Sequence, residues 1–174
     1  MSGKAGKLEA AGDRERPAIR PLTASDDDAL RALMLERWGS TRMISRGRVW
    51  EILDLPGFVA EGSEGWISYG HYRVEGDSCE VVMLDSPRPG HGGASAVLAA
   101  IADTARAAGC RRLWLITTND NLHALGFYQR RGFALSALHR DAVAEARRTL
   151  KPEIGLIGEN GIPIRDEIEF ELLL

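Results

Sequence analysis

The sequence predicts an α/β domain whose mixed, mostly antiparallel sheet is flanked by helices. Three short apolar or alternating runs, separated by glycine-containing turns, fill residues 58–84 and predict an antiparallel meander. After this meander, segments with helical periodicity alternate with short strands up to the C-terminus. The chain has 174 residues, of which 44% are hydrophobic, and this length fits one compact domain, which we expect over residues 17–174.

Two helices are expected before the meander, after a short strand at residues 19–22. Thr23 or Ser25 can cap the first helix, whose apolar positions repeat at helical spacing until Gly39 ends it. A basic stretch then leads into a short second helix, which we expect at residues 49–53.

The other expected elements follow in chain order through the meander and the second half of the chain. They are strands at residues 58–61, 66–73 and 79–84, a helix at 94–108, a strand at 112–117, a helix at 121–131, a strand that ends near His139, a helix at 141–149 and a strand at 165–174. This order gives helices on both faces of one sheet.

Composition excludes several classes of function. Charged residues make up 27% of the chain with a net charge of −3, so no basic field for nucleic acid exists. No apolar stretch approaches the roughly 20 residues that span a bilayer, so no membrane partner is expected. The polar residues 1–16 lack a signal-peptide core and predict a disordered tail. Cys79 and Cys110 belong to apolar surroundings that favour free buried thiols, hence a reducing, cytoplasmic location.

The most informative segment runs from Leu84 to Ser95 and joins a buried strand to an amphipathic helix through a glycine-rich turn. Glycines let the backbone approach a ligand, and the free N–H groups of a helix's first turn suit a phosphate. A P-loop needs Gly-Lys-Ser/Thr, but no lysine lies between Lys7 and Lys151. A dinucleotide loop needs an acidic residue about 20 positions later, where this chain has Arg111 and Arg112 instead.

A third phosphate-binding pattern fits these residues. Pro89-Gly-His-Gly-Gly-Ala94 resembles the Gln/Arg-x-x-Gly-x-Gly/Ala coenzyme A loop of GNAT superfamily N-acetyltransferases. Downstream, Asn121-Leu-His-Ala and Phe127-Tyr-Gln-Arg-Arg-Gly-Phe133 resemble the second motif of that family. The resemblance covers residues 19–139 and implies a GNAT-like fold. Pro89 stands where glutamine or arginine is usual, so Arg88, one place earlier, is the candidate substitute cation.

The resemblance implies an acetyl-CoA-dependent N-acetyltransferase that acts by direct transfer to a primary amine in a ternary complex, without a metal. Tyr128 would protonate or hydrogen-bond the departing thiolate, although a core aromatic is the alternative. Asn121 would bond the cofactor arm or cap a helix, and Phe127 is mainly core under either interpretation. The residues expected to bind the cofactor are Val82, Met83, Leu84, Arg88, Gly90, His91, Gly92, Gly93, Ala94, Ser95, Asn121, Phe127 and Tyr128.

The acceptor requires a base, because an amine with a pKa near about 10.4 is almost fully protonated at neutral pH. Glu80 is the candidate base, and a solvent-facing strand glutamate is the alternative; Glu61 and His71 are weaker candidates. By resemblance, the acceptor walls include Trp38 and Arg42. These two, with Arg46 and Arg48, could receive a carboxylate or phosphate, or could simply be solvated.

Two other hypotheses stay open at this point. The chain could be a coenzyme A-binding regulatory or interaction module without efficient transfer, or it could transfer a longer acyl group. The acceptor could be a small molecule or a peptide. The oligomeric state is open as well: the apolar end of the last strand, residues 172–174, could pair with a second copy to give a homodimer.

Overall fold

The structure is a computed structural model that describes residues 17–158 and 160–174. The tail expected at residues 1–16 lies outside the described residues. Both cysteines are buried and free, as predicted. None of the helices in the described part of the chain is long and apolar enough to cross a membrane.

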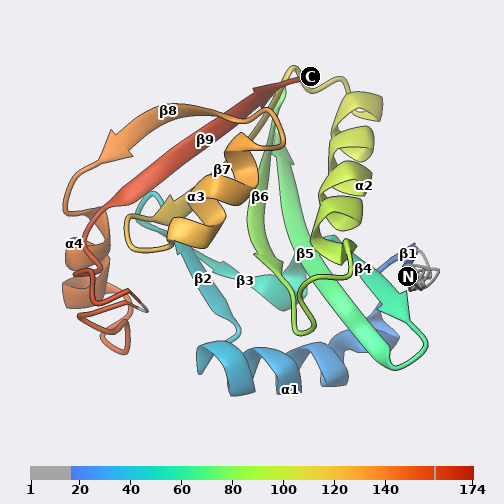
Figure 1. The fold of residues 1–174 in the computed structure, drawn as a ribbon, viewed down its shortest axis with the longest axis horizontal. Coiled ribbons are helices and arrows are strands. Elements are labelled where there is room, and N and C mark those ends of the chain that lie inside the picture. Colours follow the sequence, from blue (N-terminus) through green and yellow to red (C-terminus); the bar gives the residue numbers. More distant parts are fainter. Residues whose placement is uncertain (1–16, 159) are drawn as a thin grey trace, which may run out of the picture.

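A seven-stranded sheet runs through the molecule in the order β1-β4-β5-β6-β7-β9-β8 (Figure 1). Neighbouring strands are antiparallel except for β6 and β7, which are parallel. The predicted mixed, mostly antiparallel sheet is therefore confirmed. The strands are β1 (Ala18–Pro21), β4 (Gly57–Gly62), β5 (Gly65–Glu75), β6 (Ser78–Asp85), β7 (Arg112–Thr118), β8 (Ala134–His139) and β9 (Glu167–Leu173).

Helices cover both faces of this sheet, because alternate residues of each strand enter two separate cores. Ala60 belongs to the core under α2 (Gly93–Ala107) and α3 (Leu122–Gln129), together with Ile101 and Phe170. Its neighbour Val59 belongs to the core under α1 (Asp27–Trp38), together with Met34. Two short 3₁₀ turns, η1 (Ala24–Asp26) and η2 (Ile52–Asp54), and the helix α4 (Ala142–Thr149) complete the fold.

The helix predicted at residues 49–53 is wrong. A two-stranded hairpin, β2 (Arg42–Ser45) with β3 (Arg48–Glu51), occupies this region, and η2 follows it. Arg46 and Gly47 have φ angles of 49° and 71°, and two successive left-handed residues make the turn that fits the twist of a hairpin. The sequence signal for this hairpin is weak, because such turns usually contain Asn-Gly or Asp-Gly and this one contains Arg46-Gly47.

The last strand lies inside the sheet rather than at its edge. β9 pairs with β7 along its whole length and with β8 from Glu167 to Glu171. Residues 172–174 extend beyond the part of β9 that pairs with β8, so pairing of this end with a second copy stays a prediction. β8 forms this edge of the sheet instead.

Candidate functional site

The two parallel strands at the centre of the sheet separate. Pairing between β6 and β7 ends at Val81 and Leu115, although the strands continue to Asp85 and Thr118 (Figure 1). Beyond that point β6 pairs only with β5, with an irregularity that leaves Val82 as an extra residue. Bulges of this kind are common beside active sites. The edge of β6 that faces away from β5 is thus left open toward a split between the strands.

The open end of the split leads to the glycine-rich turn. Gly90 and Gly92 have φ angles of 89° and 76°, a conformation that strongly favours glycine, and a Cβ at either would meet nothing within 4 Å. Gly93 serves another purpose, because a Cβ there would approach Cγ2 of Ile67 to 2.6 Å. The turn is therefore open to a ligand above Gly90 and Gly92, while Gly93 lets α2 begin against the sheet.

The first turn of α2 presents unpaired backbone donors. The first N–H of the helix to bond back along the chain is that of Ala96, which donates to the Gly92 carbonyl at 3.1 Å. The amides of residues 93–95 precede it and have no acceptor inside the helix. Together with the positive end of the helix dipole, they form a site for an anion.

A partly buried ion pair fixes the strand end that precedes this turn. The Arg37 guanidinium donates two hydrogen bonds to the Asp85 carboxylate, at 2.5 and 2.8 Å. The Ser68 hydroxyl donates to the Asp85 carbonyl at 2.6 Å, and the amide of Ser86 donates to the Asp85 carboxylate at 2.8 Å. α1 and β5 thereby hold the start of the turn in position.

Two arginines near the glycine-rich turn have different hydrogen-bond partners. Arg88, the substitute cation of the sequence prediction, donates to the Glu64 carboxylate and to the carbonyls of Gly65 and Trp66. Arg131 instead donates to the Ser95 hydroxyl in the first turn of α2, with 3.0 Å between Nε and Oγ. Sequence reasoning missed Arg131, although it belongs to the second motif.

The Arg131 side chain is also held by the helix before it. Its guanidinium lies 3.5 Å from the centre of the Phe127 ring, and its Nη1 donates to the Phe127 carbonyl at 2.9 Å. Burial lowers the pKa of the Arg131 guanidinium below its usual range. The four-residue spacing between an aromatic ring and an arginine in one helix is the signal that could have identified this contact.

Tyr128 lies at the closed end of the split, on the face covered by α2 and α3. Its ring packs against Phe127, Phe133 and Phe170, and the last of these is the cross-strand partner of Leu115, where β6–β7 pairing ends. Burial raises the pKa of Tyr128, and its hydroxyl makes no hydrogen bond to the described residues. The side chain is a core aromatic that also carries a free phenol.

Asn121 and Phe127 make the contacts expected of a helix cap and of a core residue, respectively. Asn121 accepts a hydrogen bond from the amide of Ala124 at 3.0 Å and caps α3. Phe127 is partly buried in the core beside Tyr128, with 5.1 Å between the two ring centres.

Glu80 lies on the opposite face, under the β2–β3 hairpin. It is 3% exposed, so the alternative of a solvent-facing glutamate is wrong. Its Oε2 accepts a hydrogen bond from Arg73 at 2.8 Å, while its buried Oε1 has no partner among the described residues. Glu80 lines a pocket of about 200 Å³, which is completed by Arg46, Arg73, Glu75, Ser78, Arg112 and Trp114.

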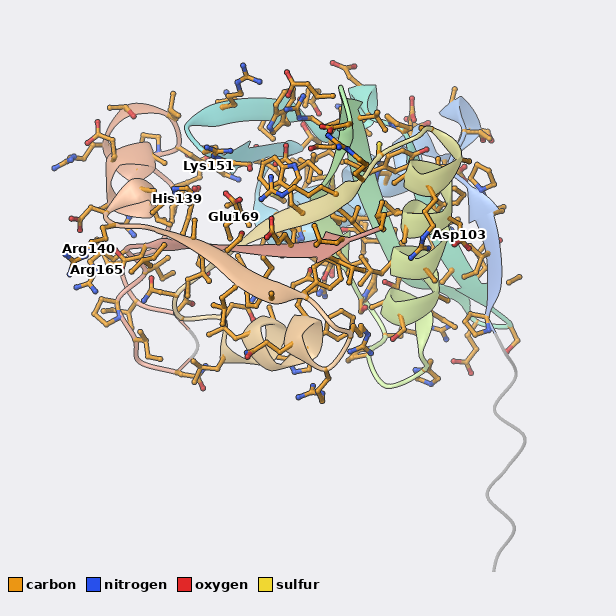
Figure 2. The ribbon with its side chains drawn as sticks, turned by 90° about the horizontal axis from the view of Figure 1, so that it is seen from above. Asp103, His139, Arg140, Lys151, Arg165 and Glu169 are labelled. Atoms are coloured by element: carbon orange, nitrogen blue, oxygen red, sulfur yellow. The ribbon has the colours of Figure 1, made fainter. Side chains whose placement is uncertain are left out.

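Two further buried carboxylates, missed by sequence reasoning, lie on β9 of the same face. Glu169 accepts hydrogen bonds from Arg112 at 2.5 Å and His139 at 2.9 Å (Figure 2). Burial alone would raise the pKa of Glu169, but these two bonds bring it below its usual range. Glu167 accepts a hydrogen bond from the Arg46 amide at 3.2 Å, and burial raises the pKa of Glu167. Their alternation with the apolar residues of the strand was the available signal.

The residues predicted to bind the acceptor lie apart from this pocket. Trp38 is partly exposed at the end of α1, and Arg42 is exposed on β2. The Arg42 carbonyl accepts a hydrogen bond from Lys151, which extends from the segment after α4 toward β2 (Figure 2). Arg46, from the hairpin turn, is the one arginine of this basic stretch that lines the pocket.

The two weaker candidates for a base are both engaged. The Arg20 guanidinium donates to Glu61 at 2.7 and 3.0 Å and lowers its pKa. His71 is 1% exposed, and its Nδ1 lies 3.2 Å from the Leu55 carbonyl. Burial lowers the pKa of His71 to about 4, so the ring is neutral at neutral pH. Both residues therefore have structural roles in this fold.

Comparison with known proteins gives consistent results. The model of the acetyltransferase (GNAT) family matches residues 28–133. The uncharacterized protein YdhI of Bacillus subtilis is 41% identical over 140 residues, which are 80% of this chain and 87% of YdhI. A Bacillus subtilis acetyltransferase solved with CoA has a TM-score of 0.70 at 20% identity, covering 91% of this chain and 99% of that one. A GNAT acetyltransferase of Elizabethkingia anophelis with acetyl-CoA bound has a TM-score of 0.67 at 16% identity, covering 92% and 99%.

Proposed function

Because the chain belongs to the GNAT family of acetyltransferases, we propose that it transfers an acetyl group from acetyl-CoA to a primary amine in a ternary complex. One observation carries this proposal: the open edge of β6 and the open glycine turn meet at the same end of the same strand. A thioester arm on the strand and a diphosphate on the turn would be neighbours there. The solved relatives with CoA or acetyl-CoA bound support this choice of acyl donor.

The described residues fit such a donor. Backbone groups of residues 82–85 are available to hydrogen-bond the amides of a pantetheine arm as an added strand would. The amides of residues 93–95 suit its diphosphate, and Arg131 adds a cation beside Ser95. A second pocket, of about 260 Å³, adjoins Ser95 and Arg131 between α2 and β9 and has room for part of the nucleotide end.

In this proposal, the two faces of the sheet supply different chemistry. Tyr128 is protonated at neutral pH, since burial raises its pKa further above neutrality, and its hydroxyl is the proposed proton donor to the departing sulfur. The acceptor amine approaches from the hairpin face, where buried carboxylates line the sheet. Direct transfer then needs no covalent enzyme intermediate.

The first test is thermal unfolding with coenzyme A. A ligand at about 100 times its Kd stabilises the folded state by about 2.7 kcal/mol, which raises the Tm of a chain of this size by roughly 5–10 °C. No shift at millimolar coenzyme A would contradict the proposal. Thiol release from acetyl-CoA over a panel of amines then tests transfer, and stabilisation without any release would indicate a binding module. Competition between acyl chains of different length tests the acetyl group itself.

A further inference from the structure

We propose that Glu167, rather than Glu80, is the base that removes a proton from the acceptor amine. The inference rests on the proposed acetyl transfer and adds a catalytic residue that lies outside both sequence motifs. Three observations support it: the position of the Glu167 carboxylate on β9, the partners already bound by Glu80 and Glu169, and the groups that surround Glu167.

Position is the first argument. Glu167 is the cross-strand partner of Thr118, which lies three residues beyond Leu115, where β6–β7 pairing ends. Glu167 is therefore level with the open part of the split. Its Oε2 accepts a hydrogen bond from the amide of Arg46, so the side chain lies on the hairpin face. Tyr128 packs on the other face of the same strands, against Phe170. The split thus lies between a phenol on one side and a carboxylate on the other.

Availability is the second argument. Glu80 already forms an ion pair with Arg73 through Oε2, and its unpartnered Oε1 is fully buried. Glu169 forms an ion pair with Arg112 and a hydrogen bond with His139. A carboxylate oxygen that already accepts a hydrogen bond from an arginine is less available to an incoming ammonium group. Glu167 forms no ion pair with the described residues, and its Oε1 accepts no hydrogen bond from them.

The surroundings of Glu167 make it a stronger base than an ordinary glutamate. The groups that act on it are Arg46 from the hairpin turn, His139 from β8 and Glu80 from β6, while Glu169 follows two residues later on β9. Burial outweighs the opposing effects of Arg46 and His139 and raises the pKa of Glu167 above its usual value of 4.5. A base of higher pKa accepts an ammonium proton more readily near neutral pH.

The proton balance of the step is simple. The carboxylate of Glu167 takes one proton from the ammonium, and the neutral nitrogen attacks the thioester carbon. The C–N bond forms and the C–S bond breaks, while Tyr128 gives a proton to sulfur and regains one from the nitrogen. Glu167 then releases its proton to water, so each turnover yields an amide, a free thiol and one proton.

The test uses two nucleophiles that differ in their need for a base. One is an alkylamine, namely whichever of ethylamine and putrescine the wild type acetylates faster. The other is hydroxylamine, whose nitrogen is already unprotonated at neutral pH. We expect Glu167→Gln to lower kcat/KM for the alkylamine by about 100-fold. We expect the rate with hydroxylamine to fall less than about threefold, since no general base is needed there.

The matched control is Glu171→Gln, on the same strand and the same face, which should keep both rates within about twofold because Glu171 lies beside the closed, paired part of β6 and β7. An equal loss with both nucleophiles would show a structural role and overturn the inference. A full rate with Glu167→Gln would overturn it as well, and a 100-fold loss in Glu80→Gln alone would transfer the role to Glu80.

The pH profile separates catalysis from folding. In the wild type, kcat/KM for the alkylamine should rise with pH as Glu167 loses its proton, and Glu167→Gln should lose this limb. A structural defect would lower the whole profile and leave its shape. Coenzyme A should still raise the Tm of Glu167→Gln, which shows that this variant folds. If it does not, Glu167→Asp is used instead, and its kcat/KM should still rise with pH, at a lower rate than in the wild type. If the wild type is not stabilised by coenzyme A and releases no thiol, the proposed function itself fails.

Discussion

The two faces of the sheet around the β6–β7 split are built in different ways. On the face of α2 and α3, the proposed donor site comes from two continuous segments, residues 82–95 and 121–133. On the hairpin face, the acidic pocket and Glu167 come from five separate elements, namely the β2–β3 turn, β5, β6, β7 and β9. The first face is recognisable in the sequence because the proposed donor binding depends on local backbone shape. The second is not, because its residues meet only when distant strands become neighbours.

The two faces also differ in their charged and polar groups. The donor face offers unpaired backbone N–H groups and one arginine, which together suit an anion. The hairpin face buries carboxylates, most of which are balanced by arginines such as Arg73 and Arg112. Glu167 differs from these carboxylates because no side chain among the described residues forms an ion pair with it. Three measurements would sharpen or break this division between the two faces.

The largest effect is expected for Tyr128→Phe on the donor face. Removing the phenol should lower kcat by about 100-fold, because proton transfer by a positioned side chain contributes at least this much. The Kd for coenzyme A should change less than about threefold, and the Tm should stay nearly constant, since the hydroxyl makes no hydrogen bond to the described residues. Steady-state kinetics and a binding titration check both. An unchanged kcat would leave Tyr128 as a core residue only.

The next effect concerns the stability of the opposite core. His71 has a pKa of about 4 in the fold, against 6.5 when unfolded, because burial disfavours its charged form. The unfolded chain therefore binds more protons as the pH falls from 6.5 toward 4, and stability is lost in that window. Between pH 7 and pH 5 this linkage amounts to about 2 kcal/mol. Denaturant unfolding should show this loss in the wild type and not in His71→Gln; equal pH slopes would contradict it.

The smallest effect is expected for Arg131→Ala. Loss of the cation beside Ser95 should raise the Kd for coenzyme A about tenfold, which is about 1.4 kcal/mol of binding free energy, with little change in kcat. Arg130→Ala is the control, since Arg130 is the exposed neighbour of Arg131 and Arg131 is the residue that donates to Ser95. Isothermal titration checks both variants. Equal weakening in the two would mean that net charge alone matters, and a matching loss in Arg88→Ala would restore the original assignment to Arg88.

Prediction from sequence succeeded where the signal was local. The meander, α2, the strand before it and the terminal strand follow from short-range periodicity and glycine turns, and the structure confirms them. The hairpin at residues 42–51 was mistaken for a helix because its turn is an Arg-Gly pair in a basic stretch. The roles assigned to Tyr128 and to the glycine loop stay predictions, since they need a bound donor to test.

What the sequence determined by itself was the family, the order of the elements outside the β2–β3 hairpin, and the glycine-rich turn before α2. Each of these depends on φ angles, helix termini or hydrophobic period over a few residues. The tertiary structure decided the insertion of β9 between β7 and β8, the burial of Glu80 and the meeting of Arg46 with Glu167, 121 residues apart. Such contacts depend on strand order and on which alternate residues face which layer, and no local pattern encodes the choice of a distant neighbour.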